Sequence, residues 1–197
     1  MSAHPLVSAA LAPAHVPAGS VWHHIFQDRF PDPLGFGYGP SRFSDPRLRR
    51  ANRFGVYYVG ATFEVAFLEA VVRDRRDGNP APFPMTETEL STWAHVPVTV
   101  RQLLNTVDLR DGACIALGVS TDTVRARAQA KGRKASLAVW QRREQFDGIL
   151  YQSRLNTQDN IAVYDRAVPR LDAGPRRRLN ACPEIAPLLE RYNVVLV

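Results

Sequence analysis

Residues 55–73 read GVYYVGATFEVAFLEAVVR, and this stretch does most to decide the fold class. The apolar run Gly55–Val59 is typical of a buried strand, and the Gly-Ala-Thr turn that follows it breaks the strand. Thr62 is a predicted helix N-cap, because its side-chain oxygen can accept a hydrogen bond from the first helical turn. A helix is therefore expected from Phe63 to Arg73, and its nearly continuous apolar surface indicates that it is buried.

The elements on either side of this unit lack the regular rhythm of a doubly wound sheet, which predicts an α+β fold. No internal repeat is present, so residues 20–197 are expected to form one domain with a mixed β core and flanking helices. Residues 1–19 lack a basic start and are interrupted by proline and histidine, which predicts a flexible N-terminal arm and not a signal peptide. Further strands are expected at Val21–Phe26, Trp93–Val100, Gln102–Leu109, Gly148–Gln152, Asn160–Tyr164 and Asn193–Val197, and helices at 111–117, 121–129, 134–145 and Glu184–Arg191.

The composition limits the classes of protein to which the chain can belong. Its 197 residues are 45% hydrophobic and 22% charged, which suits one soluble domain and argues against disorder. No stretch approaches the ~18 uninterrupted apolar residues of a membrane span. Cys114 and Cys182 lie far apart and outside any metal-ligand spacing, so we expect free thiols in a reducing cytoplasm and no bound metal.

Basic residues outnumber acidic residues by 25 to 19, and all of them except Lys131 and Lys134 are arginine. The arginine clusters at 47–53, 73–76 and 176–178 are compatible with nucleic acid, an acidic partner or an anionic small ligand. They are also compatible with solvated faces of the protein, and biased codon usage accounts for the shortage of lysine equally well. Charge alone therefore leaves the kind of ligand open.

The most informative single position is Glu69, an acidic residue on the helix that is expected to be buried. An acid in such a place is costly unless it has a partner. One interpretation is an ion pair with Arg73, four residues further along the helix. The other is a carboxylate directed into a cleft beside the preceding strand. Tyr57 and Tyr58 on that strand point to opposite faces, so one ring can face the same cleft, although both can simply be packed.

The long loop over residues 27–53 is rich in glycine, proline and arginine, and loops of this length are often functional. Arg29 and Arg42 bracket it, and two guanidinium groups can grip a pyrophosphate, although each alone is equally a solvated side chain. His23 and His24 lie in the strand expected before the loop and point to opposite faces. A histidine there is either a structural donor or a hydrogen-bonding group for a ligand's ribose or phosphate.

Three blocks of sequence, taken together, resemble the RES-domain family, toxins of bacterial toxin–antitoxin pairs named for Arg, Glu and Ser. The first block is VWHHIFQDRF followed by PSRFSDP. The second is GVYYVGATFEVAFLE, in which Tyr58 and Glu69 stand eleven positions apart, as in the family pattern. The third is DGILYQSR with NIAVY downstream, which places Ser153 and Asn160. The resemblance covers about residues 21–165.

The resemblance implies an ADP-ribosyltransferase-like fold for residues 20–197 and NAD⁺ as a substrate. Members either cleave NAD⁺ to free nicotinamide, by hydrolysis or phosphorolysis, or transfer ADP-ribose to a protein acceptor. The nicotinamide–ribose bond breaks through an oxocarbenium-like state, and Glu69 is expected to stabilise that cation. The resemblance implies Glu69, Tyr58 and Arg42 as catalytic residues, and His24, Arg29, Arg42, Tyr58, Ser153 and Asn160 as residues that bind NAD⁺.

One position departs from the family pattern, because His24 stands before Ile25 where the family usually has arginine. A histidine can still donate a hydrogen bond to ribose or phosphate. The departure also leaves open an inactive scaffold that only binds an antitoxin-like partner. The basic composition leaves open a basic RNA-binding or RNA-cleaving toxin, although the sequence carries no RNA-binding motif.

The toxin interpretation also implies a partner, a small helix-turn-helix antitoxin of the Xre type that neutralises the protein by covering the cleft. We expect an adjacent reading frame to encode it. The antitoxin would carry the DNA contacts, so no direct contact with nucleic acid is expected of this chain. No membrane contact is expected either, and the expected location is the cytoplasm.

Overall fold

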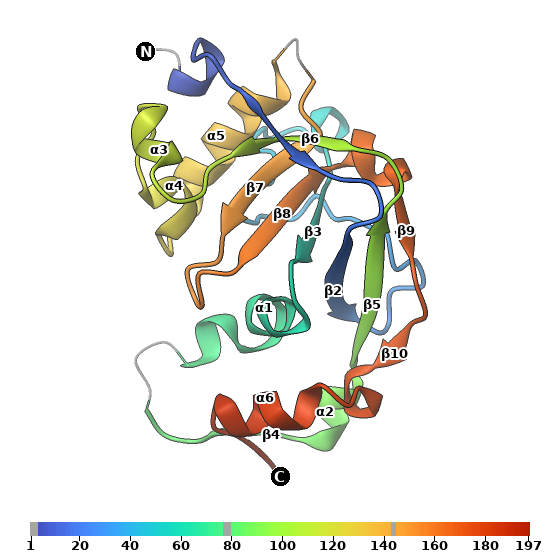
Figure 1. Ribbon diagram of the computed structural model, residues 1–197. Helices are drawn as coiled ribbons and strands as arrows, with labels where there is room; N and C mark the ends of the chain where they lie inside the picture. The colour runs from blue at the N-terminus through green and yellow to red at the C-terminus, as the bar shows by residue number, and fades with distance from the viewer. Residues whose placement is uncertain (1–3, 77–79, 143–144) are drawn as a thin grey trace.

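The computed structural model describes residues 4–76, 80–142 and 145–197. Its main feature is a curled sheet with the strand order β1-β6-β7-β8-β3-β2-β5-β10, in which β9 also pairs with β5 (Figure 1). The strands are β1 (Pro13–Val16), β2 (Val21–Gln27), β3 (Val56–Gly60), β5 (Trp93–Val100), β6 (Leu104–Asp108), β7 (Gly148–Gln152), β8 (Asp159–Tyr164), β9 (Leu171–Ala173) and β10 (Arg177–Arg178). A separate parallel pair is formed by β4 (Phe83–Met85) and β11 (Val194–Leu196).

Helices cover the two ends of the curled sheet, with α3, α4 and α5 beside β6 and β7 and with α1, α2 and α6 at the opposite end (Figure 1). The α-helices are α1 (Phe63–Phe67), α2 (Glu87–Ser91), α3 (Ala113–Ala116), α4 (Asp122–Arg125), α5 (Ala130–Trp140) and α6 (Ile185–Arg191). A π-helical turn, Leu68–Val72, continues α1, and short 3₁₀ turns occupy Pro5–Val7, Arg50–Asn52, Arg73–Arg76, Asp165–Arg170 and Leu179–Ala181.

Buried side chains form three groups that hold these elements together. The first, which includes Phe54 and Ile149, lies between the sheet and α3–α5. The second, which includes Val96 and Ile161, belongs largely to strands of the curled sheet. The third joins α1 to α6 around Phe67. Burial of one large apolar side chain contributes about 1.5–3 kcal/mol to the free energy of folding. Because each group contains many such side chains, the three groups together hold the helices at both ends against one sheet.

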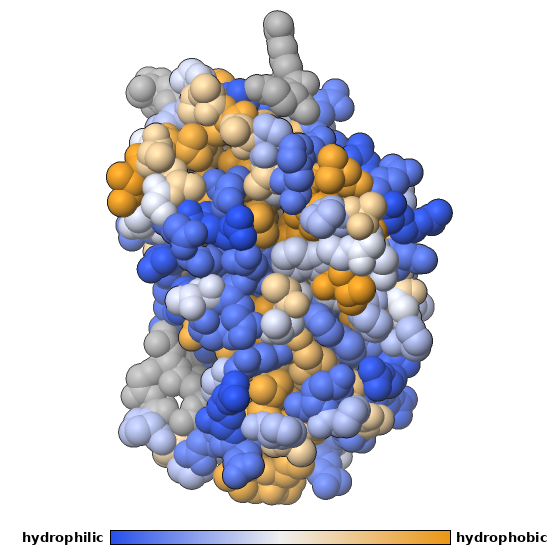
Figure 2. All heavy atoms as spheres, in the orientation of Figure 1, coloured by the Kyte–Doolittle hydropathy of each residue, from blue (hydrophilic) through white to orange (hydrophobic). Residues whose placement is uncertain are grey.

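The molecular surface is mixed in character. Hydrophilic residues cover much of the face seen in Figure 2, and apolar residues gather at its lower end, over the region of β4, β11 and α6. Val195, Leu196 and Val197 are exposed there. Among the described residues, no helix combines the length and hydropathy that a membrane-spanning helix requires.

The predicted α+β class with one mixed sheet and flanking helices is confirmed. The strands β5 and β7 have the predicted bounds, and β2 begins at the predicted Val21. The helix predicted for 134–145 instead begins at Ala130 and ends at Trp140, while residues 143–144 lie outside the described residues. The strand bounds could be predicted from the sequence because these strands are buried and form continuous apolar runs.

The N-terminal segment differs from the loose arm that was predicted for residues 1–19. Pro13–Val16 form β1, which pairs antiparallel with Leu104–Val107 of β6. Leu6 is fully buried against the group of side chains around α5, and the Arg142 guanidinium donates to the carbonyl oxygens of Leu6 and Ala9. The segment therefore contributes a strand and a buried side chain, although proline and alanine weaken its strand signal.

The strand–turn–helix unit is built as its sequence predicts, with one change in helix type. Thr62 Oγ1 accepts a hydrogen bond from Val65 N, 3.2 Å away, which confirms the predicted N-cap. A Cβ added at Gly60 would lie 2.5 Å from Val65 Cγ1, so only glycine lets the helix start this close to the strand. After Phe67 the helix becomes π-helical, a form that is rare and frequently found at functional sites.

Candidate functional site

A cavity of about 240 Å³ lies between the sheet and the π-helical turn. Its floor is one row of residues across the adjacent strands β2, β3, β8 and β7. His23 stands opposite Gly60, Gly60 opposite Asn160, and Asn160 opposite Tyr151. Residues directly opposite in antiparallel strands point to the same face, so all four line one cavity. Glu69 from the π-helical turn lines it as well.

Glu69 is held by a serine that is distant in the sequence. Ser153 Oγ lies 2.7 Å from Glu69 Oε1 and 3.1 Å from the backbone nitrogen of Leu155. Because the serine oxygen already accepts from Leu155 N–H, its own proton is free to be donated to the carboxylate. Ser153 is only 2% exposed, whereas Glu69 is half-buried and reaches the cavity. This position agrees with the interpretation of Glu69 as a carboxylate that faces a cleft, and Arg73 lines the same cavity.

The two tyrosines of β3 divide between the core and the cavity, as strand periodicity predicts. Tyr57 is 1% exposed and donates to the carbonyl oxygen of Pro33 at 3.0 Å. Tyr58 lines the cavity, and its phenolic oxygen accepts from the backbone nitrogen of Phe43 at 2.9 Å and contacts Ser41 Oγ at 2.9 Å. Burial raises the pKa of Tyr58, so its phenol is uncharged at neutral pH.

Arg42 reaches the cavity from the long loop and is clamped by α4 and α5. It is only 6% exposed, and its Nη1 donates to the carbonyl oxygen of Ala126 at 2.7 Å. A Cβ added at Gly132 of α5 would lie 2.4 Å from the Arg42 carbonyl oxygen, so the helix and the loop backbone are in close contact. Ser136 Oγ donates to the next carbonyl oxygen, that of Phe43, at 2.6 Å. These contacts fix the backbone at Arg42 and therefore the position from which its side chain enters the cavity.

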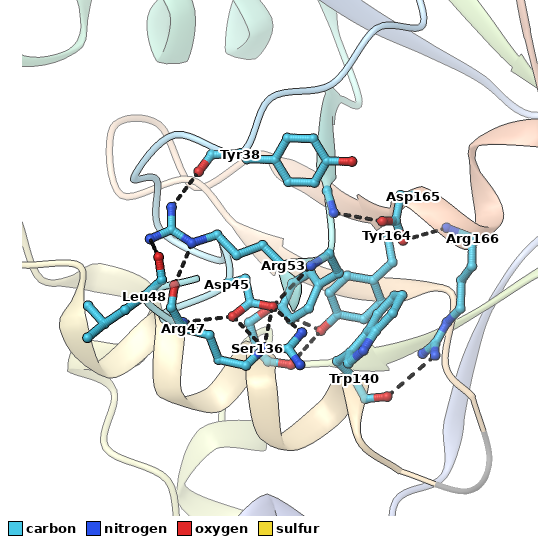
Figure 3. Close-up of polar contacts among 12 residues, drawn as sticks. Tyr38, Asp45, Arg47, Leu48, Arg53, Ser136, Trp140, Tyr164, Asp165 and Arg166 are labelled. Atoms are coloured by element: carbon cyan, nitrogen blue, oxygen red, sulfur yellow. Dashed lines mark hydrogen bonds and ion pairs between the residues drawn. The ribbon is translucent and has the colours of Figure 1, made fainter. Parts of the chain in front are cut away.

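The rest of the loop is held by its own polar contacts (Figure 3). Asp45 accepts from the backbone nitrogens of Arg47 and Phe54, at 2.8 and 3.0 Å, and pairs with the Arg47 guanidinium. Arg53 donates to the carbonyl oxygens of Tyr38 and Leu48. Arginines of this cluster therefore serve in part to fold the loop, which was not evident from the sequence.

The cavity has a positive electrostatic balance. Arg42 and Arg73 line it together with Glu69. Burial lowers the pKa of Arg42, the negative charge of Glu69 raises it, and the nearby charges of Arg73 and Arg154 lower it. An anion that enters the cavity therefore meets at least two guanidinium groups, which are the side chains best suited to bind phosphate oxygens. Arg73 was considered as an ion-pair partner of Glu69 and as a member of the arginine cluster 73–76, but it was not among the residues predicted to bind NAD⁺.

Arg29, which was predicted to grip the ligand beside Arg42, does not line this cavity. It is exposed, it does not line the cavity, and its guanidinium lies 5.1 Å from the ring centre of Phe30. The loop of residues 27–53 therefore contributes one arginine to the cavity and not two.

The paired histidines have separate partners. His24 Nδ1 donates to the carbonyl oxygen of Tyr58 at 2.7 Å, and burial lowers the pKa of His24 to about 4. His23 Nδ1 lies 3.0 Å from Nε2 of His95, a residue with no role predicted from the sequence. His95 is 2% exposed, and burial lowers its pKa to about 4. The His23 ring packs against Phe63 and His95, whereas the His24 ring packs against Phe26 and Tyr57. The two side chains therefore point to opposite faces of β2, as predicted, although both residues line the cavity.

Asn160 and Tyr151 complete the site. Asn160 is 4% exposed, and its Nδ2 has no hydrogen-bond partner within the described part of the chain. Tyr151 packs edge-on against Phe43, with ring centres 4.8 Å apart, and burial keeps its pKa well above the usual value. Sequence reasoning missed Tyr151, although its position in GILYQ, across the hairpin from Asn160, carried the signal.

No metal site accompanies the cavity in the described ranges, where His, Cys, Asp and Glu form no cluster of three that could hold an ion. Cys114 and Cys182 are buried free thiols. The chemistry available in the cavity is thus one carboxylate, guanidinium groups, neutral phenols and imidazoles, and an unsatisfied amide. This set suits a ligand that carries both phosphate groups and a centre of developing positive charge.

Comparisons with known proteins identify relatives of the chain in both sequence and fold. A family model described as the RES domain matches residues 14–183. The protein named Probable toxin y4kH, from Sinorhizobium fredii, is 34% identical over 129 residues, which are 64% of this chain and 100% of that protein. A chain in the crystal structure of the M. tuberculosis MbcT-MbcA toxin-antitoxin complex superimposes with a TM-score of 0.65 and 15% identity, over 91% of each chain. The structural likeness shows a shared fold.

Proposed function

Because this chain belongs to the RES domain family, we propose that it is the toxin of a toxin–antitoxin pair and that it consumes NAD⁺. The proposed reaction cleaves the bond between nicotinamide and ribose. The observation that carries the proposal is the position of Glu69, held by Ser153 at the wall of a cavity that Arg42 and Arg73 also line. The name of the Sinorhizobium relative supports the assignment as a toxin.

The charges of the cavity match those of the proposed substrate. NAD⁺ carries a diphosphate next to a ribose that becomes positively charged as nicotinamide leaves. Arg42 and Arg73 are suited to the diphosphate oxygens, and Glu69 is suited to the developing sugar cation. The cavity of about 240 Å³ is smaller than the roughly 300–1,000 Å³ of sites for drug-sized ligands. It therefore suits the nicotinamide–ribose end, with the adenosine end outside.

The cleavage step requires little proton transfer. The bond between ribose C1′ and the pyridinium nitrogen breaks, its electron pair passes to the ring, and nicotinamide leaves as a neutral molecule. The oxocarbenium that remains is stabilised by the carboxylate of Glu69, whose orientation Ser153 maintains. An oxygen nucleophile then bonds to C1′ and loses its proton to solvent. Water gives ADP-ribose, phosphate gives ADP-ribose phosphorylated at C1′, and a protein side chain gives an ADP-ribosylated acceptor.

The RNA-binding alternative receives less support from the arginine clusters than the sequence suggested. Arg47 pairs with Asp45, and Arg176 and Arg178 both pair with Asp28 at 2.5 and 3.0 Å. These cations are partly neutralised within the chain, whereas binding of a nucleic-acid backbone depends on free ones. Salt-sensitive RNA binding without NAD⁺ turnover would move the proposal to the RNA-binding class.

The decisive experiment is incubation of the purified protein with NAD⁺, followed by mass spectrometry of the small molecules and of the total protein. Free nicotinamide is expected in every case. The second product distinguishes hydrolysis, phosphorolysis in phosphate buffer, and a mass increase on a protein acceptor. The Glu69→Gln variant serves as the control for contaminating activity. Wild-type protein that releases nicotinamide no faster than Glu69→Gln contradicts the proposal and leaves the inactive scaffold.

The proposed partner is a small helix-turn-helix antitoxin of the Xre type that covers the cavity, in a cytoplasmic complex. The structurally similar chain comes from a toxin-antitoxin complex, which supports a partner of the antitoxin class. Co-expression with the product of an adjacent reading frame tests it. A stable complex that restores growth and blocks nicotinamide release is expected, and toxicity that no neighbouring gene relieves counts against it.

A further inference from the structure

A second cavity, of about 270 Å³, lies beside α3 and α4 and shares no lining residue with the first. Its wall begins at Leu109 and Asp111, just after β6, and continues through α3, α4 and the end of β7 (Figure 1). Its other lining residues are Cys114, Ile115, Thr121, Val124, Arg125 and Gln152. The proposed reaction uses none of them, so a ligand of this cavity is distinct from the ligand of the first.

The inner wall of the second cavity is apolar. Leu109 and Cys114 are each 1% exposed, and Val124 is 5% exposed. Burial raises the pKa of the Cys114 thiol, so at neutral pH this residue presents an uncharged, weakly polar surface. Ile115, which is 75% exposed, extends the apolar wall to the molecular surface. The inner part of the cavity is therefore suited to an aliphatic group of a ligand.

A carboxylate is held in a defined position at this cavity. Asp111 has a φ of 47°, in the left-handed region that aspartate tolerates better than most residues. The backbone nitrogen of Asp111 donates to Gln152 Oε1 at 3.4 Å, and Gln152 Nε2 donates to Asp111 Oδ1 at 3.2 Å. No cation pairs with Asp111 among the residues that the structure describes. Its second carboxylate oxygen, Oδ2, is therefore left for a ligand that carries a positive charge.

A guanidinium lines the same cavity and also lacks an ionic partner. Arg125, the last residue of α4, is exposed, and no carboxylate pairs with it within residues 4–76, 80–142 and 145–197. Thr121, one turn earlier, lines the cavity as well. Guanidinium and hydroxyl groups together are suited to the carboxylate of a ligand. Two opposite charges, Asp111 and Arg125, thus line one cavity without forming an ion pair with each other.

We propose that the second cavity binds a free amino acid with an aliphatic side chain. Asp111 binds the α-ammonium group, Arg125 and Thr121 bind the α-carboxylate, and the side chain packs on the apolar inner wall. A zwitterion satisfies both charges at once, whereas a simple anion is repelled by Asp111 and a simple cation by Arg125. The volume of about 270 Å³ lies just below the roughly 300–1,000 Å³ of sites for drug-sized ligands, which agrees with a ligand of this small size.

The first arm of the test compares L-leucine with analogues on the wild-type protein, by saturation-transfer NMR titration. L-Leucinamide keeps the ammonium group and lacks the carboxylate, isocaproate keeps the carboxylate and lacks the ammonium group, and glycine keeps both charges and lacks the side chain. Each analogue is expected to bind at least about tenfold more weakly than L-leucine, because each leaves one part of the cavity without its partner. An analogue that binds as tightly as L-leucine, or L-leucine that does not bind, overturns the proposal.

The second arm uses variants that remove one charge and keep the size of the side chain. Asp111→Asn retains an oxygen for Gln152 and tolerates a positive φ, and it is expected to weaken L-leucine binding at least about tenfold without weakening isocaproate binding. Arg125→Gln is expected to weaken L-leucine and isocaproate alike without weakening L-leucinamide. Asp172→Asn and Arg101→Gln, at exposed positions outside the cavity, are the matched controls and should leave all binding unchanged.

These variants also show where the ligand binds. Wild-type affinity for L-leucine in both Asp111→Asn and Arg125→Gln would place the amino acid elsewhere and overturn the proposal. The comparison of analogues on the wild-type protein stays decisive even where a variant does not fold. Release of nicotinamide is not measured in either arm, so failure of the proposed function leaves this test unaffected.

Discussion

Ser153 Oγ and Glu69 Oε1 are joined by a 2.7 Å hydrogen bond that spans 84 positions of the chain. It connects the end of β7 to the π-helical turn after α1 and therefore ties the two sides of the cavity together. Ser153 is only 2% exposed, so its hydroxyl is held in place by the surrounding protein. The hydrogen bond therefore fixes the orientation of the Glu69 carboxylate as well as its position. Electrostatic stabilisation by a preorganised group depends on both.

Glu69→Gln is expected to lower the rate of nicotinamide release by about 10²–10³-fold, because it removes the charge while it keeps the size of the side chain. The amide oxygen can still accept from Ser153, so the thermal midpoint should change little. The measurement is initial-rate chromatography of nicotinamide. Glu64→Gln is the matched control, since Glu64 lies five residues earlier and contacts Arg191 and Tyr192 outside the cavity. Equal losses in both variants would contradict a specific role for Glu69.

Ser153→Ala is expected to lower kcat by about tenfold, less than Glu69→Gln, because it leaves the carboxylate in place without its donor. The double variant should be no slower than Glu69→Gln alone, since residues that act through one contact are not additive. Steady-state rates of the four proteins of this cycle provide the test. Losses that multiply in the double variant would show that Ser153 acts independently of Glu69.

The sequence was sufficient for those parts of the site that lie on regular, buried strands. The apolar runs predicted the strands β3 and β8, which carry Tyr58 and Asn160, whereas the choice of these two residues came from the family resemblance. That Arg42 lines the cavity and Arg29 does not could not be predicted, because a loop without periodicity gives no information on its path. His95 was overlooked because only the pairing of β2 with β5 brings it to His23, and such pairing over 72 positions is not visible in either strand.

The same limit explains why α5 was not connected with the site. Gly132 looks like a weak point in a helix, since glycine there costs about 1 kcal/mol relative to alanine. The structure shows that the missing side chain admits the backbone of Arg42, with its carbonyl oxygen 2.4 Å from where a Cβ would lie. A sequence pattern reports local preference, whereas this requirement arises from a contact with a loop 90 positions away.

Gly132→Ala is expected to destabilise the protein by about 1–3 kcal/mol despite the better helix propensity of alanine. The added Cβ would also lie 2.9 Å from the carbonyl oxygen of Thr123, so neighbouring backbone must move. Displacement of Arg42 should raise KM for NAD⁺ several-fold more than it lowers kcat. Urea denaturation and steady-state kinetics measure the two effects. Lys134→Ala, an exposed change on the same helix, is the control and should alter stability by no more than about 0.5 kcal/mol.

Stability is expected to fall as the pH drops from about 6.5 to about 4, because burial lowers the pKa of His95 from 6.5 to about 4. Between these values the unfolded chain binds a proton that the folded protein excludes, so acid favours unfolding. Protonation of His95 in the unfolded chain is expected to lower the free energy of unfolding by on the order of 3 kcal/mol once the pH has fallen to about 4. Above pH 7 this loss of stability is absent. His23, Arg177 and Glu184 act on the same ring, the first two lowering its pKa and the third raising it.

The measurement for this last prediction is the free energy of unfolding in urea at pH 7.5, 5.5 and 4.5. Since glutamine does not titrate in this range, His95→Gln should be less stable than the wild type at pH 7.5 but lose less further stability on acidification. His15→Gln is the matched control, because His15 lies at the exposed edge strand and bonds Asn105. A pH dependence that is as steep in His95→Gln as in the wild type would assign the acid sensitivity to other groups, with His24 as the first candidate.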